Sequence, residues 1–146
     1  MVTDKEKNEI STLLWLDDLR DPYQGYWLEE YAEDFIGNEM GVIWVKSYYD
    51  FIGWIKKNGL PTMIAFDHDL GEDLAIALVK KGMVKRKARE IKQQEKTGYD
   101  CAKWVVDYCM ENDVDFPEYT IQSANPVGKE NIDKLIKNFK KFRGQD

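Results

Sequence analysis

Short apolar runs alternate with amphipathic segments along this chain. The runs predict strands at residues 12–17, 42–46, 62–67 and 119–123, because a short apolar run between turn signals is typical of a strand buried on both faces. The segments between them repeat apolar residues at helical spacing and predict helices at 48–58, 98–112 and 129–142. Strands that alternate with helices predict an α/β fold with a small, mostly parallel sheet of about four strands.

Two connections in this pattern are unusually long. Residues 18–41 join the first two strands, and apolar residues at helical spacing predict a short helix at 27–36 within them. Residues 71–96 separate the third strand from its helix by far more than a usual βα loop. We expect this insertion to be helical around residues 74–92 and to cover the strand ends as a lid. The chain as a whole, residues 1–146, is expected to form one domain.

The charge of the chain is unevenly distributed. Between residues 80 and 96, eight lysines and arginines face two glutamates, so this segment carries +6 and the rest of the chain −12 within a net charge of −6. A basic segment on an acidic body could contact a polyanion or an acidic partner. The simpler alternative is a solvated helix whose cations lie over carboxylates at helical spacing.

The cysteines and the hydropathy pattern bear on localisation. Cys101 and Cys109 lie eight residues apart on a predicted helix, about 12 Å along its axis, which is too far for a disulfide between them. Two reduced cysteines, no signal-peptide pattern and no apolar run of about 20 residues indicate a cytoplasmic protein with no membrane partner.

Paired acids follow two of the predicted strands. The first strand ends in Asp17 and Asp18, and the third ends in Asp67, His68 and Asp69. Ligands of open α/β sheets bind outside the C-terminal ends of the strands, so neighbouring strands would bring three or four carboxylates together there. Such a cluster repels itself unless protons or a cation are present. Mg²⁺ is the natural cation, because it binds one or two carboxylates together with waters and substrate phosphates.

Two residues beside these acids are candidates for catalysis or phosphate binding. His68, the only histidine, could act as a general acid or base or as a metal ligand. If the strand continues to Asp69, however, the His68 side chain points away from its acidic neighbours and bonds a nearby loop instead. Arg20 could hold a phosphate bidentately, or it could pair with a local acid.

A third strand end supplies a possible anion site. Residues 121–129 leave the fourth predicted strand through small and polar residues and then open a helix, where free backbone N–H groups can cradle an anion. Ser123, Asn125 and Lys129 are the candidate phosphate-binding side chains here. Their structural alternative is a turn, in which serine and asparagine are common.

Four sequence blocks, spread over about residues 12–136, resemble the signature of cyclic-phosphate processing receiver-like domains. The blocks are residues 17–20 (DDLR), 66–71 (FDHDLG), 97–100 (TGYD) and 123–126 (SANP). The resemblance implies a receiver-like (flavodoxin-like) three-layer architecture, with Asp17 and Asp18 as metal ligands, Asp67 at the position of the receiver phosphoacceptor and Ser123 at that of its hydroxyl. Two departures stand out: the last receiver strand with its lysine is missing, and the basic insertion at 71–96 is foreign to a simple receiver.

Two functions remain open from the sequence. The first is a metal-dependent phosphoesterase or phosphotransferase acting on cyclic phosphates, either RNA 2′,3′-cyclic phosphate ends or cyclic nucleotides. Asp17, Asp18 and Asp67 would hold Mg²⁺, and either Asp67 attacks as the nucleophile or Asp69 or His68 activates water. The second is a receiver-like regulatory or interaction module that binds Mg²⁺ and phosphate without catalysis.

Overall fold

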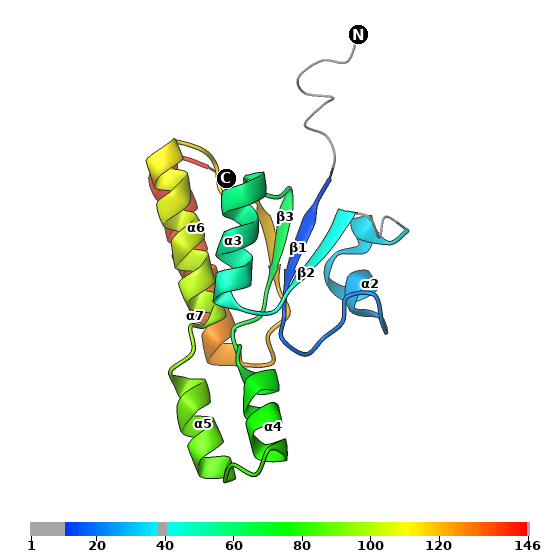
Figure 1. Ribbon diagram of the computed structural model, residues 1–146. Helices are drawn as coiled ribbons and strands as arrows, with labels where there is room; N and C mark the ends of the chain where they lie inside the picture. Colours follow the sequence, from blue (N-terminus) through cyan, green and yellow to red (C-terminus); the bar gives the residue numbers. More distant parts are fainter. Residues whose placement is uncertain (1–10, 38–40, 146) are drawn as a thin grey trace.

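The computed structural model describes residues 11–37 and 41–145, so the first ten residues of the expected domain and part of the 18–41 connection lie outside the described residues. Within that part, four parallel strands form one sheet in the order β2–β1–β3–β4 (Figure 1). The strands are β1 (Leu13–Leu16), β2 (Val42–Val45), β3 (Met63–Phe66) and β4 (Glu118–Ile121). The α/β class, the parallel sheet and the four strands are therefore confirmed.

Three helices cover one face of this sheet. They are α3 (Tyr48–Asn58), α6 (Gly98–Asn112) and α7 (Pro126–Arg143), which follow β2, β3 and β4 in turn (Figure 1). Every second residue of the two central strands enters the same core as apolar residues of these helices. The main members of this core are Leu14, Leu16, Ile64, Phe66, Phe51, Ile55, Cys101, Val105, Ile132 and Ile136.

The opposite face has a much smaller cover, made by the long β1–β2 connection. It contains α2 (Trp27–Tyr31) and the short 3₁₀ helix η1 (Glu33–Phe35), close to the helix predicted at 27–36. Leu13 and Trp15 of β1, both fully buried, pack there against Ala32 and Phe35. Helices on both faces of the sheet give the three layers of a receiver-like fold.

Helix caps explain where the helices near the strand ends begin. Thr97 and Asp100 form a reciprocal capping box at the start of α6. Asn125 caps α7 by accepting a hydrogen bond from the Gly128 N–H, and Pro126 occupies the first turn. The prediction that this last helix begins at residue 129 was therefore three residues late, because Asn125 and Pro126 start the helix instead of forming a turn.

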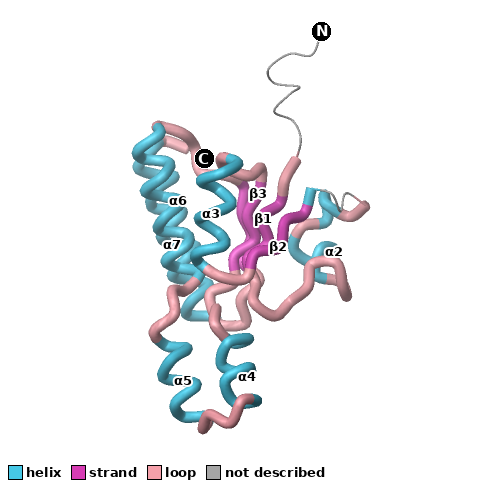
Figure 2. The backbone as a smooth tube through the Cα atoms, viewed as in Figure 1, coloured by secondary structure: helices cyan, strands magenta, loops and turns pink. Residues whose placement is uncertain are grey.

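The basic insertion forms a helical hairpin. Helices α4 (Glu72–Lys80) and α5 (Lys85–Gln93) contact each other and extend beyond the C-terminal ends of the strands (Figures 1 and 2). The expectation of one helical stretch around 74–92 was only partly right, because Gly82, with φ of +102°, turns the chain between two helices. None of the helices in the described part of the chain is both long and apolar enough to cross a bilayer.

Candidate metal and phosphate site

The acidic clusters of the sequence meet at the C-terminal edge of the sheet. Leu13 of β1 pairs with Met63 of β3, so Asp17 and Asp67 each follow four residues later on neighbouring strands. One carboxylate oxygen from each of Asp17, Asp18 and Asp67 lies within 4.8 Å of the others. All three residues are buried, with exposed fractions of 1%, 3% and 7%. The predicted convergence of the strand ends is therefore present in the structure.

The two carboxylate oxygens of Asp17 differ in their contacts. Its Oδ1 accepts hydrogen bonds from the backbone N–H groups of Leu19 (3.0 Å) and Arg20 (2.9 Å), which fold the chain back over the strand end. Its Oδ2 is buried and has no hydrogen-bond partner among the described residues. The nearest cation is the Arg20 guanidinium, 3.8 Å from this oxygen. A buried carboxylate oxygen without a partner is costly unless another group binds it.

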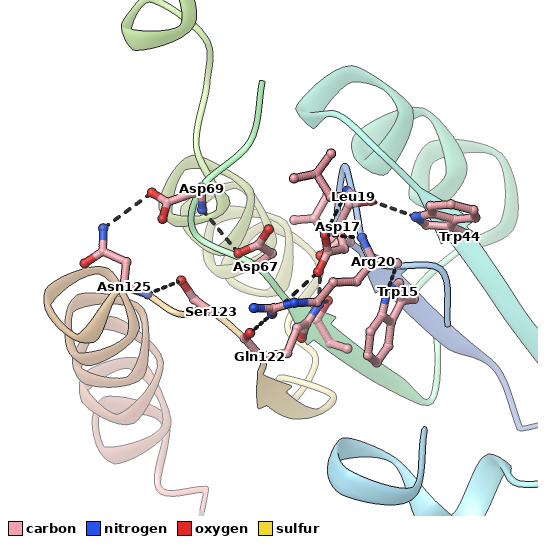
Figure 3. Close-up of polar contacts among 12 residues, drawn as sticks. Trp15, Asp17, Leu19, Arg20, Trp44, Asp67, Asp69, Gln122, Ser123 and Asn125 are labelled. Carbon is pink, nitrogen blue, oxygen red and sulfur yellow. Dashed lines mark hydrogen bonds and ion pairs between the residues drawn. The ribbon is translucent and has the colours of Figure 1, made fainter. Parts of the chain in front are cut away.

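Two indole groups hold the backbone around Asp17. Trp44 of β2 donates its Nε1–H to the Asp17 carbonyl at 2.7 Å, and Trp15 of β1 donates to the Arg20 carbonyl at 2.9 Å (Figure 3). Both rings sit in the smaller core or pack against it. The turn that presents Asp17 is thus fixed from the sheet itself.

The Asp67 carboxyl has a raised pKa. The pKa lies at about 7 instead of 3.8, because burial, and then the charges of Asp17 and Asp18, raise it by more than the hydrogen bond from the Asp69 N–H and the Arg20 charge lower it. Without a cation, the Asp67 carboxyl therefore carries a proton much of the time at neutral pH.

The start of α6 approaches Asp67 so closely that only glycine fits there. A Cβ atom on Gly98 would lie 1.9 Å from the Asp67 carbonyl oxygen, and the Gly98 N–H donates to the His68 carbonyl at 3.0 Å. Helix α6 thus buttresses the backbone that carries Asp67.

The chemistry of this donor set fits a hard divalent cation. All three groups are carboxylates, the ligand type that Mg²⁺ prefers, and the unpartnered Asp17 Oδ2 points to a missing positive ligand. Among the ion pairs of the described residues, Arg20 supplies one positive charge to this cluster, and the raised pKa of Asp67 shows that its negative charge is not fully compensated. Asp17, Asp18 and Asp67 are therefore the residues that could hold the metal.

Asp69 and His68 form a separate pair beside this cluster. The Asp69 carboxylate accepts from Asn125 Nδ2 at 3.4 Å and lies 3.1 Å from His68 Nδ1. Burial alone would raise the Asp69 pKa, but the hydrogen bonds from His68 and Asn125 and the charges of His68 and Lys92 outweigh burial and lower it. Figure 3 shows the Asp69 carboxylate turned toward Asn125 and away from Asp17.

The His68 ring packs against the first turn of α7. A Cβ atom on Gly128 would lie only 2.3 Å from the His68 Cγ atom, and His68 lines a cavity with Tyr99 and Leu135. The histidine therefore faces the helices. The strand alternation on which the sequence argument depended does not apply, because β3 ends at Phe66 and the His68 ring contacts Asp69. Its contact with Asp69 places it one residue away from the acidic cluster.

Arg20 is bound between the acidic cluster and β4. Its guanidinium donates to the Gln122 carbonyl and lies near Asp17 (Figure 3). The guanidinium also stacks 4.8 Å above the centre of the Trp27 ring. The side chain retains 26% exposure. Of the two sequence interpretations, pairing with a local acid is present, and the partial exposure leaves room for a ligand.

The sequence analysis did not identify Gln122 as part of this region. Its amide Nε2 donates to the Leu16 carbonyl at 2.9 Å and the Ala65 carbonyl at 3.5 Å, so one side chain joins the ends of β1, β3 and β4. Gln122 is 1% exposed, and its Oε1 has no hydrogen-bond partner among the described residues. The only sequence signal was an amide at the end of an apolar strand, in a segment that otherwise suggested a turn.

The three side chains expected to bind phosphate lie in different places. The Ser123 hydroxyl accepts from the Asn125 N–H at 3.1 Å, and Asn125 is engaged with Gly128 and Asp69. Both stand at the end of β4 beside Asp67 and Asp69 (Figure 3). Lys129 instead lines a cavity beside Tyr31 and Asp133. The geometry thus brings Ser123 and Asn125 to the site and directs Lys129 elsewhere.

Comparison with protein families gives one match. The model of the cyclic-phosphate processing receiver domain matches residues 12–138, which includes all four strands and every candidate residue above. Comparison with curated proteins and with solved structures gave no significant match.

Proposed function

The chain belongs to the cyclic-phosphate processing receiver family, and from this premise we propose that it is a Mg²⁺-dependent phosphoesterase that opens 2′,3′-cyclic phosphates of RNA ends or nucleotides. The observation that carries the proposal is the buried group of Asp17, Asp18 and Asp67, in which Asp17 Oδ2 has no hydrogen-bond partner among the described residues. Mg²⁺ bound by these carboxylates would supply a Lewis acid for a phosphoryl oxygen and neutralise developing charge.

The chain's own residues divide the remaining work. Arg20 is fixed by Asp17 and Gln122 beside the cluster, where its guanidinium can bind a non-bridging phosphate oxygen. The Ser123 hydroxyl, at the end of β4, can donate to a second oxygen. Trp15 and Trp44 keep the Asp17 turn in place, so these groups need little reorganisation when the substrate binds.

Two chemical routes fit this arrangement. In the first, an Asp67 carboxylate oxygen attacks phosphorus and breaks one ribose–phosphate bond; the ribose oxygen takes a proton from water, and a second water then hydrolyses the acyl phosphodiester. In the second, Asp69 or His68 removes a proton from water, whose oxygen attacks phosphorus directly; one ribose–phosphate bond breaks, and the protonated base gives the proton to the leaving ribose oxygen. The products are the same nucleoside monophosphate in both routes.

The direct test is turnover of 2′,3′-cyclic AMP and of a cyclic-phosphate RNA in the presence of Mg²⁺. Asp67→Asn is expected to lose activity in either route, whereas Asp107→Asn, a matched change at an exposed acid of α6, should retain it. An acid-quenched sample of the wild type separates the routes, because attack by Asp67 adds the full mass of the cyclic nucleotide to the protein.

A negative result has a defined meaning. Mg²⁺ binding that is lost in Asp67→Asn, without turnover of either substrate, would replace the enzyme by a Mg²⁺- and phosphate-binding receiver-like module. Equal turnover by the wild type and Asp67→Asn would show that the acidic cluster takes no part in the reaction.

A further inference from the structure

A large cleft opens between the two helices of the basic hairpin, next to the candidate site. Its volume is about 800 Å³, and its lining runs from Asp69, Leu70 and Thr97 at the foot of the hairpin out to Lys80 and Lys85 at its tip. The Asp69 N–H also donates to Asp67 Oδ1 at 3.4 Å. The cleft and the acidic cluster therefore share a boundary at Asp69.

The charge of the cleft changes along its length. The two acids in the lining, Asp69 and Glu95, stand at the foot of the hairpin. Farther out the lining contains three cations, Lys80, Lys85 and Arg89, and no acid among the described residues. Lys92 stands at the foot, near Glu95 and Asp69. A ligand that lies along this cleft meets positive charge first and the carboxylate cluster at its end.

The cations of α5 are arranged on one face. Lys85, Arg89 and Lys92 follow one another at i, i+4 and i+7, so their side chains share the face that lines the cleft. Like charges at this spacing destabilise an isolated helix. Arg86 and Glu90 of α5 form a salt bridge with each other, and both lie outside the lining. Lys80, Lys85 and Arg89 form no ion pair with any other residue in the described part of the chain.

Between these cations the floor of the cleft is apolar. Ala75, Ile76 and Val79 of α4 face Ala88 of α5 across it, and Ile76 remains 42% exposed. A floor of this kind accepts the flat faces of sugars and bases, while the cations above it follow a line of phosphates. No aromatic residue lines the cleft, so base stacking and sequence preference should both be weak.

We propose that the cleft between α4 and α5 binds single-stranded RNA and delivers its 3′-terminal cyclic phosphate to the acidic cluster. This inference rests on the function proposed above and narrows its substrate to an RNA end rather than a free cyclic nucleotide. A nine-residue helix extends about 13 Å. At about 3.4 Å for each nucleotide of a stacked strand, the cleft accommodates about four nucleotides.

The test measures binding of fluorescein-labelled RNAs of one to eight nucleotides that end in a 2′,3′-cyclic phosphate. The cleft variant combines Lys80→Gln, Lys85→Gln and Arg89→Gln. The control combines Lys56→Gln, Lys57→Gln and Lys103→Gln, which removes the same charge from exposed positions of α3 and α6. Circular dichroism verifies that both variants are folded, and kcat/KM for 2′,3′-cyclic AMP is measured in parallel.

We expect affinity to rise with length up to about four nucleotides and then level off. Loss of three phosphate contacts should lower the slope of log Kd against log salt by about 2, since each contact to a single strand contributes about 0.7. Between 50 and 200 mM salt, the wild type should therefore weaken about 20-fold more than the cleft variant. The control should behave as the wild type, and neither variant should change kcat/KM for the mononucleotide.

Three results would overturn the inference. The first is an equal loss of RNA affinity in the cleft variant and the control, and the second is an affinity that does not depend on RNA length. The third is displacement of RNA by polyglutamate at equal charge, which would identify an acidic protein as the occupant. The proposed catalysis and the proposed RNA cleft can fail independently of each other. Cleft-dependent RNA binding without opening of the cyclic phosphate would refute only the catalysis. Turnover of the mononucleotide without cleft-dependent RNA binding would refute only the RNA cleft.

Discussion

Replacement of Asp67 by asparagine should stabilise the metal-free protein by an amount that grows as the pH rises from about 4 to 7. The carboxyl has a pKa of about 7 in the folded protein against 3.8 for the free group. The folded state therefore holds this proton more tightly than the unfolded state, and wild-type stability declines as the pH rises from about 4 through 7. Asparagine keeps the shape and the acceptor for the Asp69 N–H but carries no charge, so the variant lacks this decline.

The size of the effect follows from the shift. Roughly three pKa units at 1.36 kcal/mol each correspond to about 4 kcal/mol, which is the upper limit of the gain at pH 8 in EDTA. At pH 4 the Asp67 carboxyl is protonated in the folded state, and the two proteins should have nearly equal free energies of unfolding. Mg²⁺ at 100 times its Kd should narrow this difference by about 2.7 kcal/mol, since it stabilises the wild type alone.

Urea unfolding followed by tryptophan fluorescence measures these differences, because Trp15 is fully buried beside the site. The experiment compares the wild type, Asp67→Asn and the exposed control Asp107→Asn at pH 4.5 and pH 8, each with EDTA and with Mg²⁺. The reasoning is wrong if Asp67→Asn is no more stable than the wild type at pH 8 in EDTA. It is equally wrong if the gain is the same at both pH values.

Two further predictions concern the residues that position the site. Gly98→Ala should lower the free energy of unfolding by at least about 3 kcal/mol and weaken Mg²⁺ binding in a calorimetric titration, because its Cβ would overlap the Asp67 carbonyl. The matched change Gly53→Ala, in open space on α3, should instead raise the free energy of unfolding by about 0.5–1 kcal/mol, and equal effects would contradict the close approach. Gln122→Leu should cost about 1–3 kcal/mol in urea unfolding and raise the KM for phosphate substrates, because the Leu16 and Ala65 carbonyls lose their donor; unchanged stability would show that this amide does not tie the strand ends.

Much of the candidate site was predictable because sheet geometry is simple. Apolar runs that end in acids fix both the buried strands and the place where their side chains emerge. Asp17 and Asp67 are fifty residues apart in the chain, yet the parallel pairing of β1 with β3 brings them to one edge. Sequence alone could supply this result, since it needs only the order of the strands and not the details of packing.

The remaining features depend on contacts that no local pattern encodes. Gly98 was expected only as the first residue of the helix at 98–112, but it is required by the approach of α6 to the backbone that follows β3. The role of Gln122 can be recognised only when the three strand ends that its amide joins are placed around it. Gly82 gave no decisive signal within a continuous basic stretch, so the two-helix hairpin was expected as one helical segment.

The hairpin of α4 and α5 is joined to the rest of the domain in a way that would let its ligand preference change independently of the sheet. Its two ends leave the body side by side: a Cβ on Gly71, where the φ of +88° favours glycine, would lie 3.2 Å from Glu95 Cγ. The two arms make their most extensive contacts with each other, and the carboxylate-bearing strands pack against other helices. The hairpin is therefore a separable module, and a change in its length or charge should leave the carboxylate-bearing edge of the sheet intact.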